Sequence, residues 1–403
     1  MQAWYLCENP YPFIPQEVLD SVDSVRGSLP NRYCDPQIAA RLYEECLDEY
    51  RLCDEVGLNV ISNEHHAGIN CLYGASPLIL GILARETKNV RILSLGTLVT
   101  ARPDPVRIAE EYATADVISR GRLDIGFVKS GGSEMASANS NPIGNLERFW
   151  ESIDLIKKAL TAHDGPVSWE GKHYTHRHIN IWPPCYQRPH PPLWAATGDP
   201  ETSVELAKRD IINATFVRGP DGTKKSWDAY RQARIDAGMG PAPPDRFAYM
   251  GFTYVGDSDE EGMSIGDKSL WFLRVGARSA AQYSRMLPGA TPAAQAPMLY
   301  RTAPPPGTSI TLAGGVPHVG RPAAAFRNVT AEQAVQRGVM FAGNPDTVYR
   351  QVMEFYDKVG GFEHLILMGR SGFMTHEEAE KGIKMFGKEV LPRLKEVKHA
   401  AAA

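Results

Sequence analysis

Residues 91–128 read RILSLGTLVTARPDPVRIAEEYATADVISRGRLDIGFV, and this stretch decides the fold. It begins with an apolar run at 91–98, continues with a helical pattern that starts after Pro105 and ends at Gly121, and closes with a second apolar run at 122–128. Short apolar strands that alternate with amphipathic helices are typical of βαβ units, in which neighbouring strands run parallel. The stretch therefore predicts one such unit.

The same alternation extends over most of the chain. It predicts eight strands, with helices between them, at 3–7, 59–62, 91–98, 122–128, 192–196, 211–217, 247–255 and 364–368. Eight strands in alternation with helices are the count of a (β/α)8 barrel, which commonly uses more than 250 residues as one domain. We therefore predict a single α/β domain of the TIM-barrel type over residues 1–398, and a tail at 399–403.

Two segments exceed what a barrel needs. The first, at about 163–190 after strand four, holds two candidate short strands at 167–169 and 178–182. The second, at about 257–330 after strand seven, contains a stretch at 287–322 that is rich in Pro, Ala and Gly and lacks periodicity. Long loops inside compact domains are commonly functional, so we predict that this insertion is a lid over the active site.

Composition excludes several classes of function. The 403 residues carry a formal net charge of −4 without a long run of like charges, so we expect no affinity for nucleic acid or an anionic membrane. A run of about 18 apolar residues and a signal peptide are both missing from the sequence. The six cysteines form no CxxC pair, which disfavours a zinc site and suits a reducing cytoplasm.

The end of strand two offers candidates for catalysis, because active sites of such barrels lie at the carboxyl ends of the strands. Strand two is followed by Asn63-Glu64-His65-His66. Glu64 is placed to orient a neighbouring histidine and to make it a proton carrier near neutral pH. An ordinary surface turn is the alternative, and a metal site is disfavoured because no third ligand stands at a suitable spacing.

Two other strand ends have features of a phosphate site. Strand four leads into KSGG at 129–132, where glycines let backbone amides approach a ligand and Lys129 adds a positive charge. Strand five leads into TGDPETS at 197–203, which starts a helix with Asp199 as the predicted N-cap. A flexible loop and an ordinary capped helix are the respective alternatives. The sequence contains no GxGxxG or P-loop pattern.

Several short motifs occur together along the chain. PDPVRIAEE stands at 103–111, DVISRGRLDIG at 116–126, EHH at 64–66, PHPPLW at 189–194 and GNPDTV at 343–348. Jointly they resemble the signature of the bacterial luciferase-like flavin-dependent monooxygenases, from the first strand to about Pro392.

This resemblance implies a barrel that binds reduced FMN at the carboxyl ends of its strands. His65 matches the family's catalytic histidine, and Lys129 stands where some members carry an arginine to the FMN phosphate. Strand three ends near the place where the family tends to have a non-proline cis peptide beneath the flavin ring. The cofactor-binding residues implied in this way are Thr97, Leu98, Lys129, Ser130, Thr197, Gly198, Asp199, Thr202 and Ser203.

The resemblance also implies an activity. In the family, reduced FMN (FMNH2) and O2 form a C4a-peroxyflavin that oxygenates a small organic substrate. We expect His65 to transfer a proton with Glu64 as its orienting group, and His66 and Met368, with Gly369 and Arg370, to shape the substrate pocket.

Since no dinucleotide fingerprint is present, a separate NAD(P)H:flavin reductase is expected to supply the reduced flavin. We also expect a homo-oligomer. Three alternatives remain open, namely hydride transfer with a deazaflavin on the same barrel, a non-catalytic flavin-binding relative, and a metal-dependent hydrolase.

Overall fold

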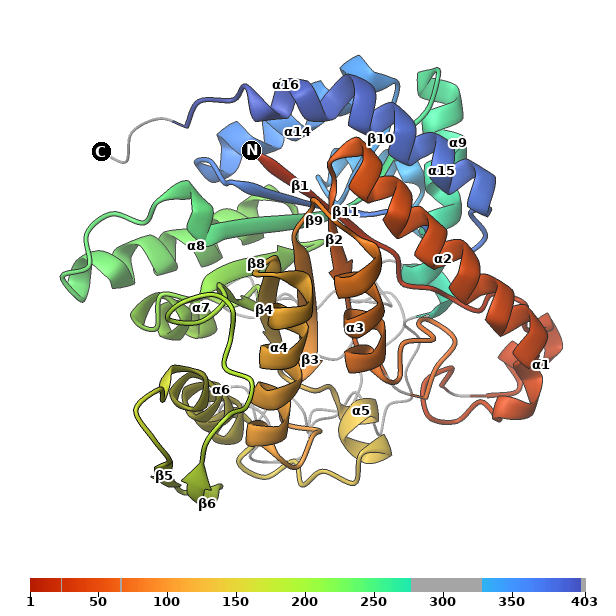
Figure 1. Ribbon diagram of the computed structural model, residues 1–403. Coiled ribbons are helices and arrows are strands. Elements are labelled where there is room, and N and C mark those ends of the chain that lie inside the picture. Colours follow the sequence, from red (N-terminus) through yellow and green to blue (C-terminus); the bar gives the residue numbers. More distant parts are fainter. Residues whose placement is uncertain (23, 66, 277–327, 400–403) are drawn as a thin grey trace, which may run out of the picture.

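A closed barrel of eight parallel strands forms the centre of the protein (Figure 1). The computed structural model describes residues 1–22, 24–65, 67–276 and 328–399. Each strand pairs in parallel with its neighbours, and the pairing of β8 with β9 closes the sheet. The predicted fold is thereby confirmed. The barrel strands are β1 (Gln2–Leu6), β2 (Asn59–Ser62), β3 (Ile92–Leu98), β4 (Leu123–Val128), β7 (Leu193–Ala196), β8 (Ile212–Phe216), β9 (Phe247–Val255) and β11 (His364–Met368).

Helices surround the barrel (Figure 1). Side-chain caps begin several of them, as at Asp104, Asp199 and Thr375, whose oxygens accept backbone N–H groups of the first turn. The longer helices are α2 (Pro36–Val56), α3 (Ser76–Glu86), α4 (Pro105–Ser119), α6 (Asn145–Thr161), α7 (Pro200–Lys208), α8 (Gly219–Asp236), α9 (Asp259–Ser269), α14 (Pro345–Val359) and α15 (His376–Met385). Shorter segments are α1 (Gln16–Asp20), α5 (Gly132–Ser137), α13 (Ala331–Gln336), α16 (Leu391–Lys395) and the π-helical η3 (Phe272–Gly276) and η4 (Phe386–Val390).

Alternation of side chains along the strands separates two cores. On β1, for example, Trp4 and Leu6 belong to the cluster inside the barrel, whereas Ala3 and Tyr5 pack in the outer cluster under the helices. Because both faces of each strand are buried, each strand is a nearly continuous apolar run that can be recognised in the sequence.

The amino-terminal part of the barrel interior is filled by aromatic side chains. The rings of Trp4 and Trp194 meet edge to face at 5.2 Å between centroids. Trp4 Nε1 donates to His364 Nδ1 over 3.3 Å, and Trp194 Nε1 donates to Asp124 Oδ2 over 2.9 Å. Because these residues stand at or near the starts of their strands, the packed interior leaves the carboxyl-terminal rim as the place for a ligand.

A ninth strand breaks the strict alternation predicted from the sequence. This strand, β10 (Met340–Gly343), pairs in parallel with the last four residues of β9. Both β8 and β10 pair with the edge of β9 that faces away from β11. The first part of β9 pairs with β8, and the last part pairs with β10. This strand was not predicted, since its identity as a strand comes from its pairing with β9.

The two predicted insertions have different outcomes. The first insertion contains two short strands, as expected, namely β5 (Val167–Glu170) and β6 (Thr175–Ile179), although β6 begins and ends three residues earlier than predicted. The two strands form an antiparallel pair. The second insertion contains α9 and η3, and α13 follows directly after it. The stretch 287–322 lies outside the described residues, so the lid remains a prediction. Within the described part of the chain, no helix is both long and apolar enough for a membrane span.

We predict that His364 makes the fold sensitive to acid. Burial lowers the pKa of this histidine from 6.5 to about 3, although its hydrogen bond with the Asp245 carbonyl opposes the change. The unfolded chain therefore binds a proton that the folded chain excludes, and stability present above pH 6.5 is lost as the pH falls. The free energy of unfolding should fall by about 1.4 kcal/mol per pH unit from this residue alone.

Urea denaturation between pH 6.5 and about 5 measures this slope. His364→Gln, which keeps a donor and an acceptor, should flatten it, and His163→Gln at an exposed position should not. Identical slopes for the wild type and His364→Gln would contradict the assignment.

Candidate active site

The carboxyl-terminal rim brings together residues that are far apart in the sequence. His65 follows β2, Lys129 follows β4, Thr197 follows β7, and Arg218 follows β8. Because all eight strands are parallel, these residues leave the barrel at the same end. The sequence-based placement of the candidate site on one rim is consistent with this topology.

His65 is held between two buried carboxylates. Its Nδ1 lies 2.8 Å from Glu134 Oε1, on α5, and its Nε2 lies 3.7 Å from Glu8 Oε2, just after β1. The backbone N–H of His65 donates to the carbonyl of Tyr73, which fixes the chain at this point. The His65 side chain keeps 24% of its surface exposed, so a ligand can reach it.

Glu134 determines which nitrogen of the His65 imidazole carries a hydrogen. Burial alone raises the pKa of its carboxyl, but the hydrogen bond and charge of His65, the charge of Arg26 and the Gly131 N–H together lower it to about 2. The Arg26 Nη1 atom lies 4.0 Å from Glu134 Oε1, and Gly131 N donates to Glu134 Oε2 over 2.7 Å. An ionised carboxylate can only accept hydrogen bonds, so Nδ1 carries a hydrogen and Nε2 is the atom left to exchange protons.

Glu64 was expected to orient His65, but in the structure Glu134 accepts the bond from the His65 ring. The Glu64 carboxylate accepts the backbone N–H of Leu98 over 3.3 Å and thereby ties the end of β2 to the end of β3. The difference arises because Glu64 is a sequence neighbour of His65, whereas the ring meets a residue from the loop after β4. His66 lies outside the described residues.

The middle of β3 contains a non-proline cis peptide bond, between Leu95 and Gly96. The expected position was near Thr97 and Leu98, so the bond stands earlier in the strand than predicted. Thr97 is buried, and its hydroxyl accepts a hydrogen bond from Tyr112 Oη over 2.6 Å.

Two cations stand on either side of the start of α7. Burial lowers the pKa of the Lys129 ammonium and that of the Arg218 guanidinium, and in both cases the charge of Asp199 opposes the shift. Within the described residues, neither cationic group makes a hydrogen bond or an ion pair. The Arg218 side chain lies against Gly198, where a Cβ atom would clash with it. This pair of cations is therefore available to an anion.

The hydroxyls predicted for the cofactor site are largely occupied. Thr197 Oγ1 donates to Asp199 Oδ2 over 2.9 Å, and the Thr202 N–H donates to Asp199 Oδ1 over 2.7 Å. Ser130 Oγ accepts from Thr100. Ser203 is fully buried and shares hydrogen bonds with Asn213, Ser226 and the Asp199 carbonyl, so its hydroxyl holds α7, α8 and β8 together.

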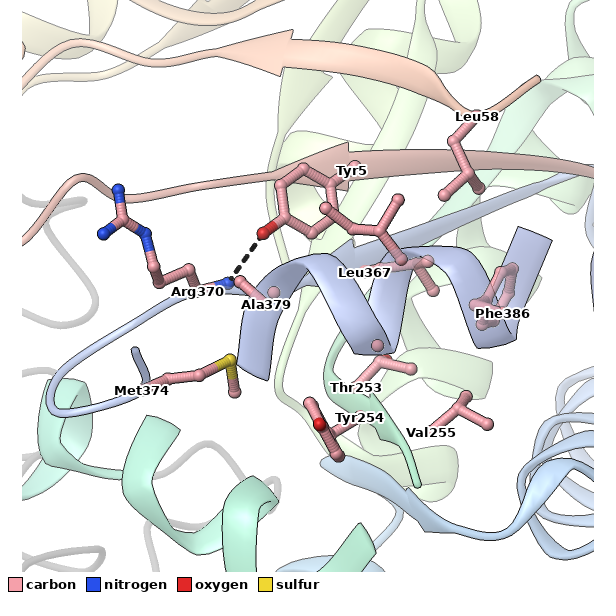
Figure 2. A pocket seen from close by; sticks show the side chains of 13 residues that line it. Tyr5, Leu58, Thr253, Tyr254, Val255, Leu367, Arg370, Met374, Ala379 and Phe386 are labelled. Carbon is pink, nitrogen blue, oxygen red and sulfur yellow. Dashed lines mark hydrogen bonds between the residues drawn. The ribbon is translucent and has the colours of Figure 1, made fainter. Parts of the chain in front are cut away.

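The residues at the end of β11 lie in two different environments. Met368 is buried in the cluster inside the barrel, at the rim. Arg370, which we expected in the substrate pocket, is instead buried outside the barrel, where its Nη1 lies 2.7 Å from Glu45 Oε2 and its Nε 2.6 Å from Glu49 Oε1. Figure 2 shows Arg370 among the side chains that line a cavity between the barrel wall and α15. The cavity measures about 20 Å³, which is room for about one water molecule. The expectation for Arg370 was wrong because two glutamates of α2 neutralise its charge there.

Sequence reasoning missed four residues of this site, namely Glu8, Arg26, Glu134 and Arg218. Glu8 and Arg218 each follow a strand within two residues, so the same strand-end argument that identified His65 would have found them. No local signal points to Arg26 and Glu134, because their contacts join loops that are distant in the sequence.

Comparison with known proteins identifies the class. Residues 34–362 match the family model of the luciferase-like monooxygenases, so the chain belongs to this family. The oxygenase component of the flavin-dependent trigonelline monooxygenase of Acinetobacter baylyi is 32% identical over 187 residues, which make up 45% of this chain and 50% of that protein. The chain thus spans about half the length of this curated relative.

Solved structures share the whole fold. Monooxygenase RslO1 from Streptomyces bottropensis has a TM-score of 0.69 at 20% identity, with 98% of this chain and 99% of that chain covered. The oxygenating constituent of the 3,6-diketocamphane monooxygenase of Pseudomonas putida, solved in complex with FMN, has a TM-score of 0.65 at 16% identity, with coverages of 97% and 98%. At these identities the likeness shows the fold.

The Glu134–His65 pair generates a prediction about stability. Because the pKa of Glu134 lies below its ordinary value of 4.5, its ionised form stabilises the fold above pH 4.5, and this contribution is lost as the pH falls toward 2. Glu134→Gln should lower the free energy of unfolding at neutral pH by about 1–3 kcal/mol, the scale of a charge-assisted hydrogen bond in a buried site. Below pH 4.5 the deficit should shrink.

Urea denaturation of both proteins across this pH range is the measurement, with Glu44→Gln at an exposed position of α2 as the matched control. A deficit that stays constant down to the lowest pH at which the chain folds would show that Glu134 is not held ionised by its neighbours.

Proposed function

We propose that this chain is the oxygenase component of a two-component flavin monooxygenase, which uses reduced FMN and O2 to oxygenate a small organic substrate. The observation that carries the proposal is that His65, paired with Glu134, stands on the same barrel rim as the two unpaired cations Lys129 and Arg218. The oxygenase component among the relatives and the FMN complex among the solved structures support it.

The residues on the rim fit a flavin that carries a phosphate. Lys129 and Arg218 supply charge-assisted donors for phosphate oxygens, and Gly198 lets the Arg218 side chain approach α7. The nearby charge of Asp199 favours the charged form of both cations. Thr97 and Leu98, at the end of β3, would contact the flavin ring. When bound, reduced FMN supplies the electrons that activate O2.

His65 is the residue that handles protons in this proposal. Its Nδ1–H is fixed by Glu134, so Nε2 takes up or delivers a proton at the reacting centre. Glu8 lies 3.7 Å from Nε2 and stabilises the imidazolium that forms when the proton arrives. The apolar interior around Leu6, Phe252 and Met368 keeps water away from the inner side of the rim.

A separate NAD(P)H:flavin reductase would supply the reduced flavin, because the chain has no glycine-rich dinucleotide fingerprint. The reducing cytoplasm that such a reductase needs also suits the six free cysteines. We further propose a homo-oligomer that forms through the neighbouring helices α3 and α4, where Leu78, Ile82, Val117 and Ile118 are exposed.

The two-component activity is tested by separating the sources of electrons. The purified chain with oxidised FMN and NADPH should consume no oxygen beyond the background. Addition of any competent flavin reductase, or of chemically reduced FMN, should support oxygen uptake and product formation across a panel of candidate substrates. Direct oxidation of NADPH by the chain alone, or turnover that needs a reduced deazaflavin and no O2, would contradict the proposal.

In that assay, His65→Ala should slow product formation by about 10²–10⁴-fold, the usual share of general acid–base catalysis. Its affinity for FMN should stay close to that of the wild type, because the proposed phosphate contacts lie on β4, β7 and β8.

The phosphate assignment has a test of its own that needs no turnover. Lys129→Met and Arg218→Met should each weaken FMN binding by about 1–3 kcal/mol, the scale of a charge-assisted hydrogen bond. Riboflavin, which lacks the phosphate, should bind each variant as it binds the wild type. Fluorescence titration with both flavins gives the ratio of the two dissociation constants. An unchanged ratio in both variants would place the phosphate elsewhere.

A further inference from the structure

A second pocket, of about 420 Å³, lies beside the candidate active site. Its walls come from the loop between β1 and α2 and from the loop between β2 and α3. Sites for small organic ligands are typically apolar and measure about 300–1,000 Å³, so this pocket has a suitable size. The lining residues are Tyr11, Ile14, Val25, Gly27, Leu29, Pro30, Asn31, Tyr33, Cys34, Ala67, Gly68, Ile69 and Leu72.

The chemistry of this lining disfavours a charged ligand. None of the thirteen lining residues carries a charged side chain, and most are aliphatic or aromatic. The adjacent Arg32 is exposed and is not a lining residue, and its charge is engaged by Tyr33, whose ring centre lies 4.8 Å from the guanidinium and whose hydroxyl accepts from Arg32 Nη2 over 3.2 Å. An ionised molecule would lose its hydration here without gaining a counter-charge, whereas an uncharged apolar molecule would gain burial. Asn31 and the hydroxyl of Tyr33 offer polar contacts.

The pocket shares a wall with the proton-handling residues. Val25 and Gly27 flank Arg26, whose guanidinium lies 4.0 Å from Glu134, the hydrogen-bond partner of His65. The Gly27 N–H donates to the Ala67 carbonyl over 2.6 Å, so the two loops are joined two residues after His65.

The order of the strands places the proposed phosphate site on one side of His65 and the pocket on the other. Around the barrel the order is β1, β2, β3, β4, β7 and β8. The unpaired cations follow β4 and β8, whereas the pocket is built on the loops that follow β1 and β2. His65, at the end of β2, therefore lies between the proposed phosphate site and the pocket.

We propose that this pocket binds an uncharged, largely apolar organic molecule. That this molecule is the substrate, presented to the reacting centre beside His65, rests on the proposed function. The binding itself does not.

A matched pair of fluorescent probes tests the binding without turnover. N-phenyl-1-naphthylamine is uncharged, and 8-anilinonaphthalene-1-sulfonate is the same framework with one sulfonate added. The uncharged probe should bind the full chain saturably, one molecule per chain, and about tenfold or more tightly than the sulfonate, because the lining lacks a cation. Equal affinities, or tighter binding of the sulfonate, would overturn the proposal.

Two further measurements place the probe in this pocket. Leu29→Trp, which fills the pocket, should weaken binding of the uncharged probe by about tenfold or more, whereas Ile235→Trp, at an exposed position of α8, should not. In the wild type, Cys34 is the one cysteine of the six that is not buried, so iodoacetamide should modify it first. A saturating concentration of the uncharged probe should slow that modification at least severalfold.

Undiminished alkylation of Cys34 in the presence of bound probe would overturn the assignment, even if Leu29→Trp fails to fold. Failure of the reductase-dependent oxygenation with probe binding intact would contradict the proposed function and leave the pocket assignment standing. Probe binding that is insensitive to Leu29→Trp would contradict the pocket assignment and leave the proposed function standing.

Discussion

The hydrogen bonds between β8 and β9 close the sheet, and the rest of the structure depends on this closure. A closed parallel barrel delivers the carboxyl end of every strand to one rim. That geometry brings His65, Lys129 and Arg218 to the same face, although they stand far apart in the sequence. At the other end, Trp4 and Trp194 fill the interior, so the barrel is a packed support below the rim and not a channel.

Charge is distributed unevenly around this rim. On the side of β1 and β2, carboxylates surround one imidazole, and Arg26 offsets part of their charge. On the side of β4, β7 and β8, two cations share the single carboxylate of Asp199. One half therefore suits proton transfer and the other suits an anion, and the uncharged pocket adjoins the first half. A phosphate-bearing cofactor and an apolar substrate would each meet the part of the rim that matches their chemistry.

The fold was predictable from the sequence because burial on both faces makes each strand a continuous apolar run, and because helix signals such as Asp104-Pro105 and Thr375 with Glu378 are local. The strand β10 was not predicted because its identity as a strand comes from pairing with β9.

The site was predictable where a residue directly follows a strand, as for His65 and Lys129. It was not predictable where contacts decide a role, since Glu134 stands 69 positions from the histidine it bonds. Arg370 illustrates the reverse case, because its position after β11 suggested the rim while its neighbours on α2 hold it outside the barrel.

In the proposed site, one rim holds the flavin phosphate on one side of His65 and the reacting centre next to it. A crystal structure of this chain with FMN bound would test this arrangement. We expect the phosphate within hydrogen-bonding distance of Lys129 and Arg218, and the flavin ring over the end of β3 with His65 Nε2 facing its edge or the space beside it. A phosphate bound away from both cations, or a ring remote from His65, would contradict it.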